Sequence, residues 1–343
     1  MSATLRIGLA GLGLHGSRYA EPLLAGSIHG AVLGAVSRGN EVAGREFAIE
    51  HGVAFAHDPC ELATIPGIDA VVAVLPPDLH PELAMACLDA RRPVLVEKPL
   101  APDARSAAQV TERVDRTGSL LMVAHTLRFD AVVQAVRTEI AGLGAVRLVA
   151  LNQRFEPTAR GWIDTPGRGG AALNTGVHGF DLMRYFTGAE AVSIVAETAS
   201  VVTERTEDEF ACVVRMEPGG VLATLDNART TAGRSGRIEI VGENGQLRAD
   251  HVVRTLARIE GRSETQLGPV PSHFTVNTAL ERFIECVRHG TPPPITAADG
   301  KAAVEMVDAC LLSAREGRRV HIDEVRSRPT AMDGRAPETR GGS

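Results

Sequence analysis

The sequence predicts an α/β protein: an N-terminal Rossmann-type doubly wound parallel sheet, then a C-terminal α+β domain with a large, mostly antiparallel open sheet. Leu5 to Ala10 is a short apolar run, typical of a strand buried on both faces. The pattern Gly11-x-Gly13-x-x-Gly16 follows directly and opens a helix. Strand and helix patterns then alternate, whereas the later strands are joined by hairpin turns, so two kinds of sheet are expected.

The N-terminal part is expected to span residues 1–125. Its predicted strands are Leu5–Ala10, Ala31–Val36, Val53–Phe55, Ala70–Leu75, Pro93–Val96 and Leu120–Ala124. Its predicted helices are Ser17–Ala25, Glu41–His51, Pro81–Ala90 and Asp103–Arg116, two of them closed by Gly52 and Gly118. Ligands of such sheets bind at the carboxyl ends of the strands, so Gly11, Ser37, Pro76 and Lys98 are expected to converge.

The second part is expected to span residues 126–326, with its helices on one face of the sheet. The predicted strands are Val146–Gln153, Val192–Thr198, Phe210–Met216, Val221–Asn227 and Ile238–Val241, with hairpin turns at Gly219-Gly220 and Glu243-Asn244-Gly245. The predicted helices are Asp130–Ala141, Gly176–Thr187, Val276–His289 and Ala298–Gly317. Residues 327–343 are rich in proline, glycine and arginine, and this composition predicts a disordered tail.

Composition narrows the class of protein. A chain of 343 residues is long enough for two domains, and its net charge of −6 argues against a nucleic-acid partner. The five cysteines form no C-x-x-C pair, which suits a reducing cytosol with thiols mostly buried. Neither a signal peptide nor a membrane span is expected, because no long apolar run is present. The histidines lack metal-ligand spacing, so no metal is predicted and the expected location is cytoplasmic.

The glycine loop predicts a dinucleotide cofactor. The first glycine allows a tight turn, the second lets a pyrophosphate approach the backbone, and the third lets the helix pack on the strand. Ser37 stands 21 residues after Gly16, where an NAD enzyme usually has an acid, and Arg38 follows. A hydroxyl beside a guanidinium suits a 2′-phosphate. NADP is therefore predicted, with NAD as the alternative; Arg38 as a solvated loop residue is the other interpretation.

Two further segments carry candidate catalytic groups. Lys98 ends a buried strand in Glu97-Lys98-Pro99, where desolvation would lower its pKa and suit it to acid catalysis or oxyanion stabilisation. A structural ion pair is an equal alternative. Asn174 and His178 would share one face of a regular helix, about 5.4 Å apart along its axis, and histidine exchanges protons near neutral pH. A lone histidine on an apolar helix is more often structural. Close approach of the backbone to a ligand is suggested by Gly167, Gly169 and Gly170.

Together these motifs resemble the Gfo/Idh/MocA family, named for glucose–fructose oxidoreductase and inositol dehydrogenase. The matching motifs are the glycine loop, Leu75-Pro76-Pro77 with His80, Glu97-Lys98-Pro99, Arg128-Phe129, Gly169-Gly170 through Asp181, and Ser313 to Gly317. The resemblance implies a Rossmann domain and an α/β domain whose open sheet serves substrate binding and oligomer contacts. Members oxidise a sugar or cyclitol hydroxyl, or reduce the matching ketone.

Carried over, the family's catalytic set becomes Lys98, Asn174 and His178. Asn174 stands where the family has an aspartate, and an amide cannot accept a proton. The usual T-P-N segment is also altered, to Leu75-Pro76-Pro77. The expected cofactor contacts are Gly11, Gly13, Leu14, His15, Gly16, Ser37, Arg38, Leu75, Pro76, His80, Glu97 and Lys98. The expected substrate contacts are His125, Arg128, Phe129, Trp162, Asn174 and His178.

The sequence thus predicts an NADP-linked oxidoreductase acting on a hydroxyl or keto group of a sugar-like molecule. His178 would exchange the hydroxyl proton, Lys98 would stabilise the alkoxide, and Asn174 would orient the substrate. Two alternatives are a cofactor-binding regulator, similar to the galactose-regulon repressor of yeasts, and a redox-assisted glycosidase. A homodimer or homotetramer is expected, because the open sheet would otherwise expose an apolar patch.

Overall fold

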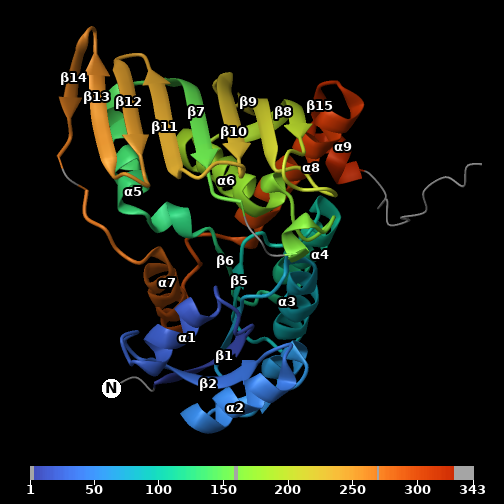
Figure 1. Cartoon of the computed structure of the whole chain (residues 1–343). Helices are drawn as coiled ribbons and strands as arrows, with labels where there is room; N and C mark the ends of the chain where they lie inside the picture. Colours follow the sequence, from blue (N-terminus) through green and yellow to red (C-terminus); the bar gives the residue numbers. More distant parts are fainter. Residues whose placement is uncertain (1–3, 158–160, 269, 328–343) are drawn as a thin grey trace, which may run out of the picture.

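A computed structural model describes residues 4–157, 161–268 and 270–327. It contains two sheets with helices around them, and the predicted fold class is confirmed (Figure 1). The first sheet is parallel throughout, with strands β1 Leu5–Ala10, β2 Ala31–Ser37, β3 Ala54–Ala56, β4 Ala70–Ala73, β5 Val94–Glu97 and β6 Leu121–Ala124. Its helices are α1 Ser17–Leu24, α2 Glu41–His51, α3 His80–Asp89 and α4 Ala104–Thr117, with the short 3₁₀ helices η1 Pro59–Ala63, η2 Pro77–Leu79 and η3 Thr126–Phe129.

Local sequence explains these boundaries. Every residue of β4, β5 and β6 is buried, as expected for apolar strands covered by helices on both faces. The Asn40 side chain accepts a hydrogen bond from the Ala43 N–H and so caps the start of α2. Gly52 ends that helix with a φ of 63°, a left-handed conformation that glycine adopts readily.

The strand order of the first sheet positions the candidate site. The order is β3-β2-β1-β4-β5-β6, so the chain reverses direction across the sheet between β1 and β4. Next to this point the Gly11 N–H donates to the Ser37 carbonyl (2.9 Å), and the Val74 N–H donates to the Ala10 carbonyl (2.8 Å). Lys98 follows β5 at the same edge. The predicted convergence of the strand ends is therefore confirmed.

The second sheet has nine strands in the order β14-β13-β12-β11-β7-β10-β9-β8-β15. Its β7–β10 pair is parallel and the other pairs are antiparallel, as predicted for a mostly antiparallel sheet. The strands are β7 Val146–Arg154, β8 Glu190–Ala199, β9 Glu209–Glu217, β10 Val221–Ala228, β11 Ser235–Gly242, β12 Gly245–Asp250, β13 Thr255–Glu260, β14 Ser263–Gln266 and β15 Val320–His321. Sequence reasoning missed β12 to β15; β14 is exposed along its whole length and so has no apolar pattern.

Helices cover one face of this sheet and leave the other open, as predicted (Figure 1). Along β9, Phe210, Cys212, Val214 and Met216 are buried, while the residues between them are exposed. The helices of this part are α5 Ala131–Glu139, α6 Val177–Thr187, α7 Thr275–His289, α8 Ala297–Glu316 and α9 Ile322–Ser327. Short helical turns are η4 Ile140–Leu143, η5 Gly161–Asp164 and the π-helical η6 Ala172–Gly176.

The chain returns to the first sheet after completing most of the second. α7 lies beside α1 in Figure 1, and Leu280 and Phe283 pack in the same apolar core as Ile7. α8 joins the two cores, since Val304 packs in the first and Val307 in the second. These two helices hold the sheets together. The expected boundaries between the two parts remain predictions.

Other expectations concern the thiols, the membrane and the tail. All five cysteines are free and four are buried, which confirms that the thiols are mostly buried. Within the described ranges, no helix has the length and apolar character needed to cross a membrane. Of the predicted tail, Ser327 ends α9, and residues 328–343 lie outside the described residues.

Candidate active site at the domain junction

The glycine loop fits the pyrophosphate of a dinucleotide. Gly11 has a φ of +96°, and a Cβ there would lie 2.1 Å from the Val74 carbonyl oxygen. A Cβ on Gly16 would lie 2.0 Å from the Gly11 carbonyl oxygen, so α1 starts in direct contact with the loop. At Gly13 an added Cβ would have nothing within 4 Å, so the backbone is open to a ligand. Each glycine thus meets the requirement predicted for it.

The end of β2 is where the adenosine ribose would be recognised. Arg38 is half-buried and directly follows the strand. Ser37 is only 3% exposed, because it belongs to the buried sheet. Of the two predicted contacts, Arg38 is therefore the one whose side chain reaches the surface.

A buried carboxylate connects the glycine loop to the end of β5. Glu97 is 4% exposed and accepts hydrogen bonds from the Tyr19 hydroxyl (2.6 Å) and the Lys98 N–H (2.9 Å). His15 Nε2 lies 2.8 Å from the same carboxylate. Burial alone would raise the pKa of Glu97, but His15, Lys98 and the Tyr19 hydrogen bond together lower it to about 2. The Glu97 side chain therefore fixes the cofactor loop in place. Sequence reasoning missed Tyr19, whose partner is distant in the chain.

His80 supports the neighbouring loop from inside. Its ring is fully buried, and Nδ1–H donates to the Pro99 carbonyl (2.7 Å) while Nε2 accepts from the Leu75 N–H (3.4 Å). Burial lowers the pKa of His80, which keeps the ring neutral and suits this donor–acceptor pattern. Both nitrogens are occupied, so His80 ties together the loops after β4 and β5 and has no nitrogen left for a ligand.

Lys98 connects the two parts of the molecule. Its Nζ donates a hydrogen bond to the backbone carbonyl of Asn174 (2.8 Å). Burial lowers the pKa of Lys98, Glu97 acts in the opposite direction, and Arg229 lowers the pKa further. The lysine predicted from the sequence thus reaches the segment that carries the predicted asparagine and histidine.

The backbone of that segment differs from the regular α-helix on which the sequence argument depended. Ala172–Gly176 is a single π-helical turn, and α6 begins only at Val177. A π turn holds more residues than an α turn, so Asn174 and His178 are offset around the helix axis. π turns are frequent at functional sites. The contact between Lys98 and Asn174 is made by the backbone carbonyl, not by the side-chain amide.

His178 is half-buried and lies close to Lys98 and His125. Its Nδ1 is buried and has no hydrogen-bond partner in the described part of the chain. Burial, together with the charge of Lys98, holds the pKa of His178 well below its usual value. The ring is therefore neutral near pH 7 and able to accept a proton. Since Nδ1 is enclosed, Nε2 is the ring nitrogen available to a ligand.

Three residues expected to touch the substrate have side chains that are buried or nearly so. His125 is fully buried, and Phe129 is 7% exposed within the first core. The Arg128 guanidinium binds both oxygens of Asp181, at 2.8 and 2.6 Å. Because these residues follow β6, the sequence placed them at the correct edge of the sheet. It could not show how deeply their side chains are buried. Trp162 lies in η5, and its side chain falls outside what the structure describes.

An ion pair that the sequence did not suggest crosses between the two parts. Arg168, in the glycine-rich loop after η5, lies 2.7 Å from Asp78 of η2. Both side chains are partly exposed, so the pair is expected to contribute little to stability. The pair does hold the loop that carries Arg168 next to the turn that carries Asp78.

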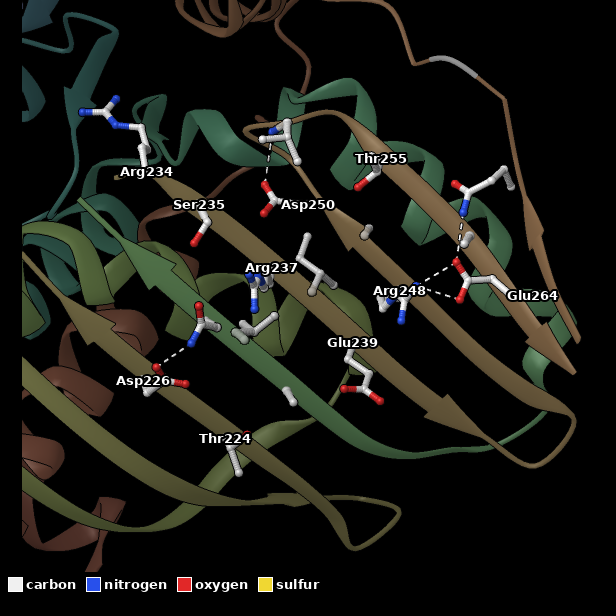
Figure 2. Close-up of a pocket in the computed structure, with 18 residues that line it drawn as sticks. Thr224, Asp226, Arg234, Ser235, Arg237, Glu239, Arg248, Asp250, Thr255 and Glu264 are labelled. Atoms are coloured by element: carbon white, nitrogen blue, oxygen red, sulfur yellow. Dashed lines mark hydrogen bonds and ion pairs between the residues drawn. The ribbon is translucent and has the colours of Figure 1, made fainter. Parts of the chain in front are cut away.

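A separate hollow lies on the open face of the second sheet. It has a volume of about 710 Å³, and Figure 2 shows the side chains that line it, among them Asp226, Arg237, Glu239 and the Arg248–Glu264 ion pair. None of the predicted site residues lines it. The hollow therefore belongs to the open face and not to the junction that holds Lys98 and His178. Within the described residues, no group of three or more acidic, histidine or cysteine side chains could hold a metal.

Comparison with known proteins identifies the two halves separately. The model of an "Oxidoreductase family, NAD-binding Rossmann fold" matches residues 5–125, and that of an "Oxidoreductase family, C-terminal alpha/beta domain" matches residues 137–322. The chain is 30% identical to myo-inositol 2-dehydrogenase of Thermotoga maritima over 337 residues, covering 94% of this chain and 99% of that one. It is 29% identical to scyllo-inositol 2-dehydrogenase (NAD(+)) of Bacillus subtilis, covering 95% and 99%. The crystal structure of a probable dehydrogenase from Thermotoga maritima superposes with a TM-score of 0.80 at 29% identity, covering 94% and 100%.

The Glu97 cluster predicts a specific loss of stability in acid. A carboxylate whose folded pKa is about 2 contributes stability that is present above its unfolded pKa, about 4.3, and is lost as pH falls towards 2. Tyr19→Phe removes one hydrogen bond to this charge and is expected to lower the free energy of unfolding at pH 7 by about 1.5–3 kcal/mol. It should also reduce the decline between about pH 4.3 and pH 2. Denaturant titration across this range measures both effects.

Tyr185→Phe is the matched control, because the Tyr185 ring packs against Arg128 and Arg137, far from Glu97 along the chain. Equal stability loss and an equal acid profile for the two variants would contradict the role given to the Tyr19 hydroxyl.

Proposed function

The chain belongs to the Gfo/Idh/MocA oxidoreductase family and binds a nicotinamide dinucleotide, and from this premise we propose that it interconverts a hydroxyl group and a ketone on a sugar or cyclitol. The inositol 2-dehydrogenases that cover nearly its whole length support this substrate class. The observation that carries the proposal is the junction itself. Lys98 from the first sheet meets the Asn174–His178 segment of the second part, at the edge that carries the glycine loop.

Three residues of the chain have different roles in the proposed reaction. When bound, the nicotinamide accepts or supplies the hydride. His178 takes the hydroxyl proton at Nε2, because its ring is neutral and its Nδ1 is enclosed. Lys98 exchanges its bond with the Asn174 carbonyl for one with the substrate oxygen and stabilises the negative charge that develops there. The Asn174 amide orients a neighbouring hydroxyl group.

We propose NADP as the preferred cofactor. β2 ends without a carboxylate, and the half-buried Arg38 follows it. A guanidinium binds a phosphate through charge-assisted hydrogen bonds, whereas NAD offers only hydroxyl groups at this position. The glycine loop and the Leu75-Pro76 segment would hold the rest of the cofactor; Leu75 lies against Gly11.

Arg38→Ala is expected to weaken NADP binding roughly ten- to a hundredfold, the loss of one charged hydrogen-bonding pair of about 1.5–3 kcal/mol. NAD binding should change little. Fluorescence titration of both cofactors measures the dissociation constants, with the exposed Arg282→Ala as the control for removing a cation. Tighter binding of NAD than NADP by the unaltered protein would refute the assignment.

We also propose that the open face of the second sheet joins copies of this chain into a homodimer or homotetramer. Val195 and Val213 are opposite one another on β8 and β9 and are 40% and 46% exposed. Leu222 of β10 is 38% exposed on the same face. An unpartnered sheet face of this kind is typical of an interface, and a second copy would cover it.

Val213→Asp is expected to shift the protein towards monomers, because a charge would be buried without a partner. Val42→Asp, on the exposed surface of α2, is the matched control and should leave the assembly intact. Light scattering at micromolar concentration reads out the mass. A monomeric unaltered protein would exclude the proposed interface.

The catalytic assignment predicts a graded loss of turnover. His178→Ala should lower kcat about 10²–10⁴-fold and Lys98→Ala about 10²–10³-fold, while cofactor binding survives the first change. Asn174→Asp should raise activity or shift its pH profile, because a carboxylate beside the histidine favours the imidazolium. Steady-state kinetics with a panel of polyols and keto-sugars tests all three.

His289→Ala, an exposed position at the end of α7, controls for the loss of a histidine and should not change kcat. An active protein in which His178→Ala is equally fast would refute the role of His178. A protein that binds cofactor and never turns over any substrate of the panel would refute the oxidoreductase proposal itself.

A further inference from the structure

Two helical turns face each other behind the candidate active site. His125 precedes η3, and Arg128 lies three residues later within it. His178 and Asp181 are also three residues apart, on the first turns of α6, and so share one side of that helix. Arg128 binds Asp181 with both nitrogen donors, and the His125 and His178 rings meet edge to face with their centroids 6.2 Å apart.

His125 is an unusual group for this position. Its side chain is fully buried, and neither ring nitrogen has a hydrogen-bond partner in the described part of the chain. Burying a polar group without a partner costs free energy, and such groups are rare enough to require an explanation. The nearest carboxylate is that of Asp181, whose Oδ2 lies 3.9 Å from His125 Nδ1, just beyond hydrogen-bond distance. On the other side, His178 Nδ1 is likewise buried without a partner.

The three unpaired nitrogens therefore belong to two neighbouring rings, and one of these rings lies beside Asp181. We propose that His125 is a positioning residue that links Asp181 to His178: Asp181 accepts a bond from His125 Nδ1–H, and His125 Nε2 accepts one from His178 Nδ1–H. Nε2 of His178 is then left without a proton and faces the substrate. This inference rests on the proposed function of His178.

The 3.9 Å between His125 Nδ1 and Asp181 Oδ2 is longer than a direct hydrogen bond, so the proposed arrangement requires these groups to approach when the site is occupied. Catalytic hydrogen bonds often tighten only in the substrate complex. Arg128 also contacts Asp299, and Asp299 contacts Arg184, so the Asp181 carboxylate is held rigidly from behind. Burial lowers the pKa of both histidines, which keeps both rings neutral before the reaction, as the line of bonds requires.

The reaction transfers one hydride and one proton, and the arrangement gives each of them a destination. Oxidation of a carbinol removes a hydride, with its electron pair, from carbon to the nicotinamide, and a proton from oxygen to His178 Nε2. His178 then carries a proton on both nitrogens, and the positive charge is stabilised through His125 by the Asp181 carboxylate. In serine hydrolases a carboxylate bonded directly to the catalytic histidine stabilises the imidazolium; here His125 would stand between the two. Asp181 supplies the negative charge that the amide of Asn174 cannot supply.

The tautomer of His178 tests this arrangement without any turnover. Long-range nitrogen–proton NMR spectra of the ¹⁵N-histidine-labelled protein, saturated with NADP, distinguish the proton on Nδ1 from the proton on Nε2. Signals of His178 among the eleven histidines are identified by their loss in His178→Gln. The inference predicts the Nδ1–H form in the unaltered protein and a shift towards the Nε2–H form in His125→Phe. His178 in the Nε2–H form in the unaltered protein would overturn it, whether or not His125→Phe folds.

Steady-state kinetics then distinguishes a positioning role of His125 from a purely structural one. His125→Phe should lower kcat about tenfold or more, with KM and the cofactor dissociation constant much less affected. Asp181→Asn should shift the tautomer in the same direction. His273→Gln is the matched control: His273 bonds to the Phe129 carbonyl in the same η3 segment but lies outside the line, so tautomer and kcat should stay unchanged.

An unchanged His178 tautomer in a folded His125→Phe protein would overturn the inference, and so would equal effects of His125→Phe and His273→Gln. If the tautomer shifts as predicted but no substrate is ever turned over, the line of bonds stands and only the proposed function fails.

Discussion

The buried carboxylate of Glu97 is the constraint on which the site depends. It sits at the end of β5 and receives hydrogen bonds from the first helix, from the glycine loop and from the backbone of Lys98, which follows the strand. Removing any one of these partners leaves the buried charge less compensated and is destabilising. The cofactor loop and Lys98 therefore keep a fixed relation to each other, and Lys98 in turn reaches across to the Asn174 carbonyl.

The second requirement is that the two sheets keep their relative position. α7 returns to pack with the first core, and α8 contributes residues to both cores. Lys98 and the π turn therefore face each other across packed helices. Behind the π turn, Asp181, Arg128 and Asp299 form a charged network that keeps α6 and η3 together. The active-site candidates thus lie between two hydrogen-bonded networks, one on each side of the junction.

The sequence predicted what local patterns encode. The glycine loop, the buried strands and Lys98 at a strand end all follow from contiguous residues, and the structure agrees with them. Contacts between distant residues were not predictable, so Tyr19 with Glu97 and Arg168 with Asp78 were missed. His125 was expected to touch substrate because a strand end indicates an edge of the sheet, not a depth within it. The π turn replaced an α turn that the spacing alone could not distinguish.

Transfer of a labelled hydride tests the central claim, that this junction is an oxidoreductase active site. The protein would be mixed with oxidised NADP or NAD and with polyols and cyclitols deuterated at the carbinol carbons, and the recovered cofactor examined by NMR. The account predicts deuterium at C4 of the nicotinamide with at least one of these substrates, and its loss in His178→Ala and Lys98→Ala. Tight cofactor binding with no deuterium transferred from any of them would contradict it.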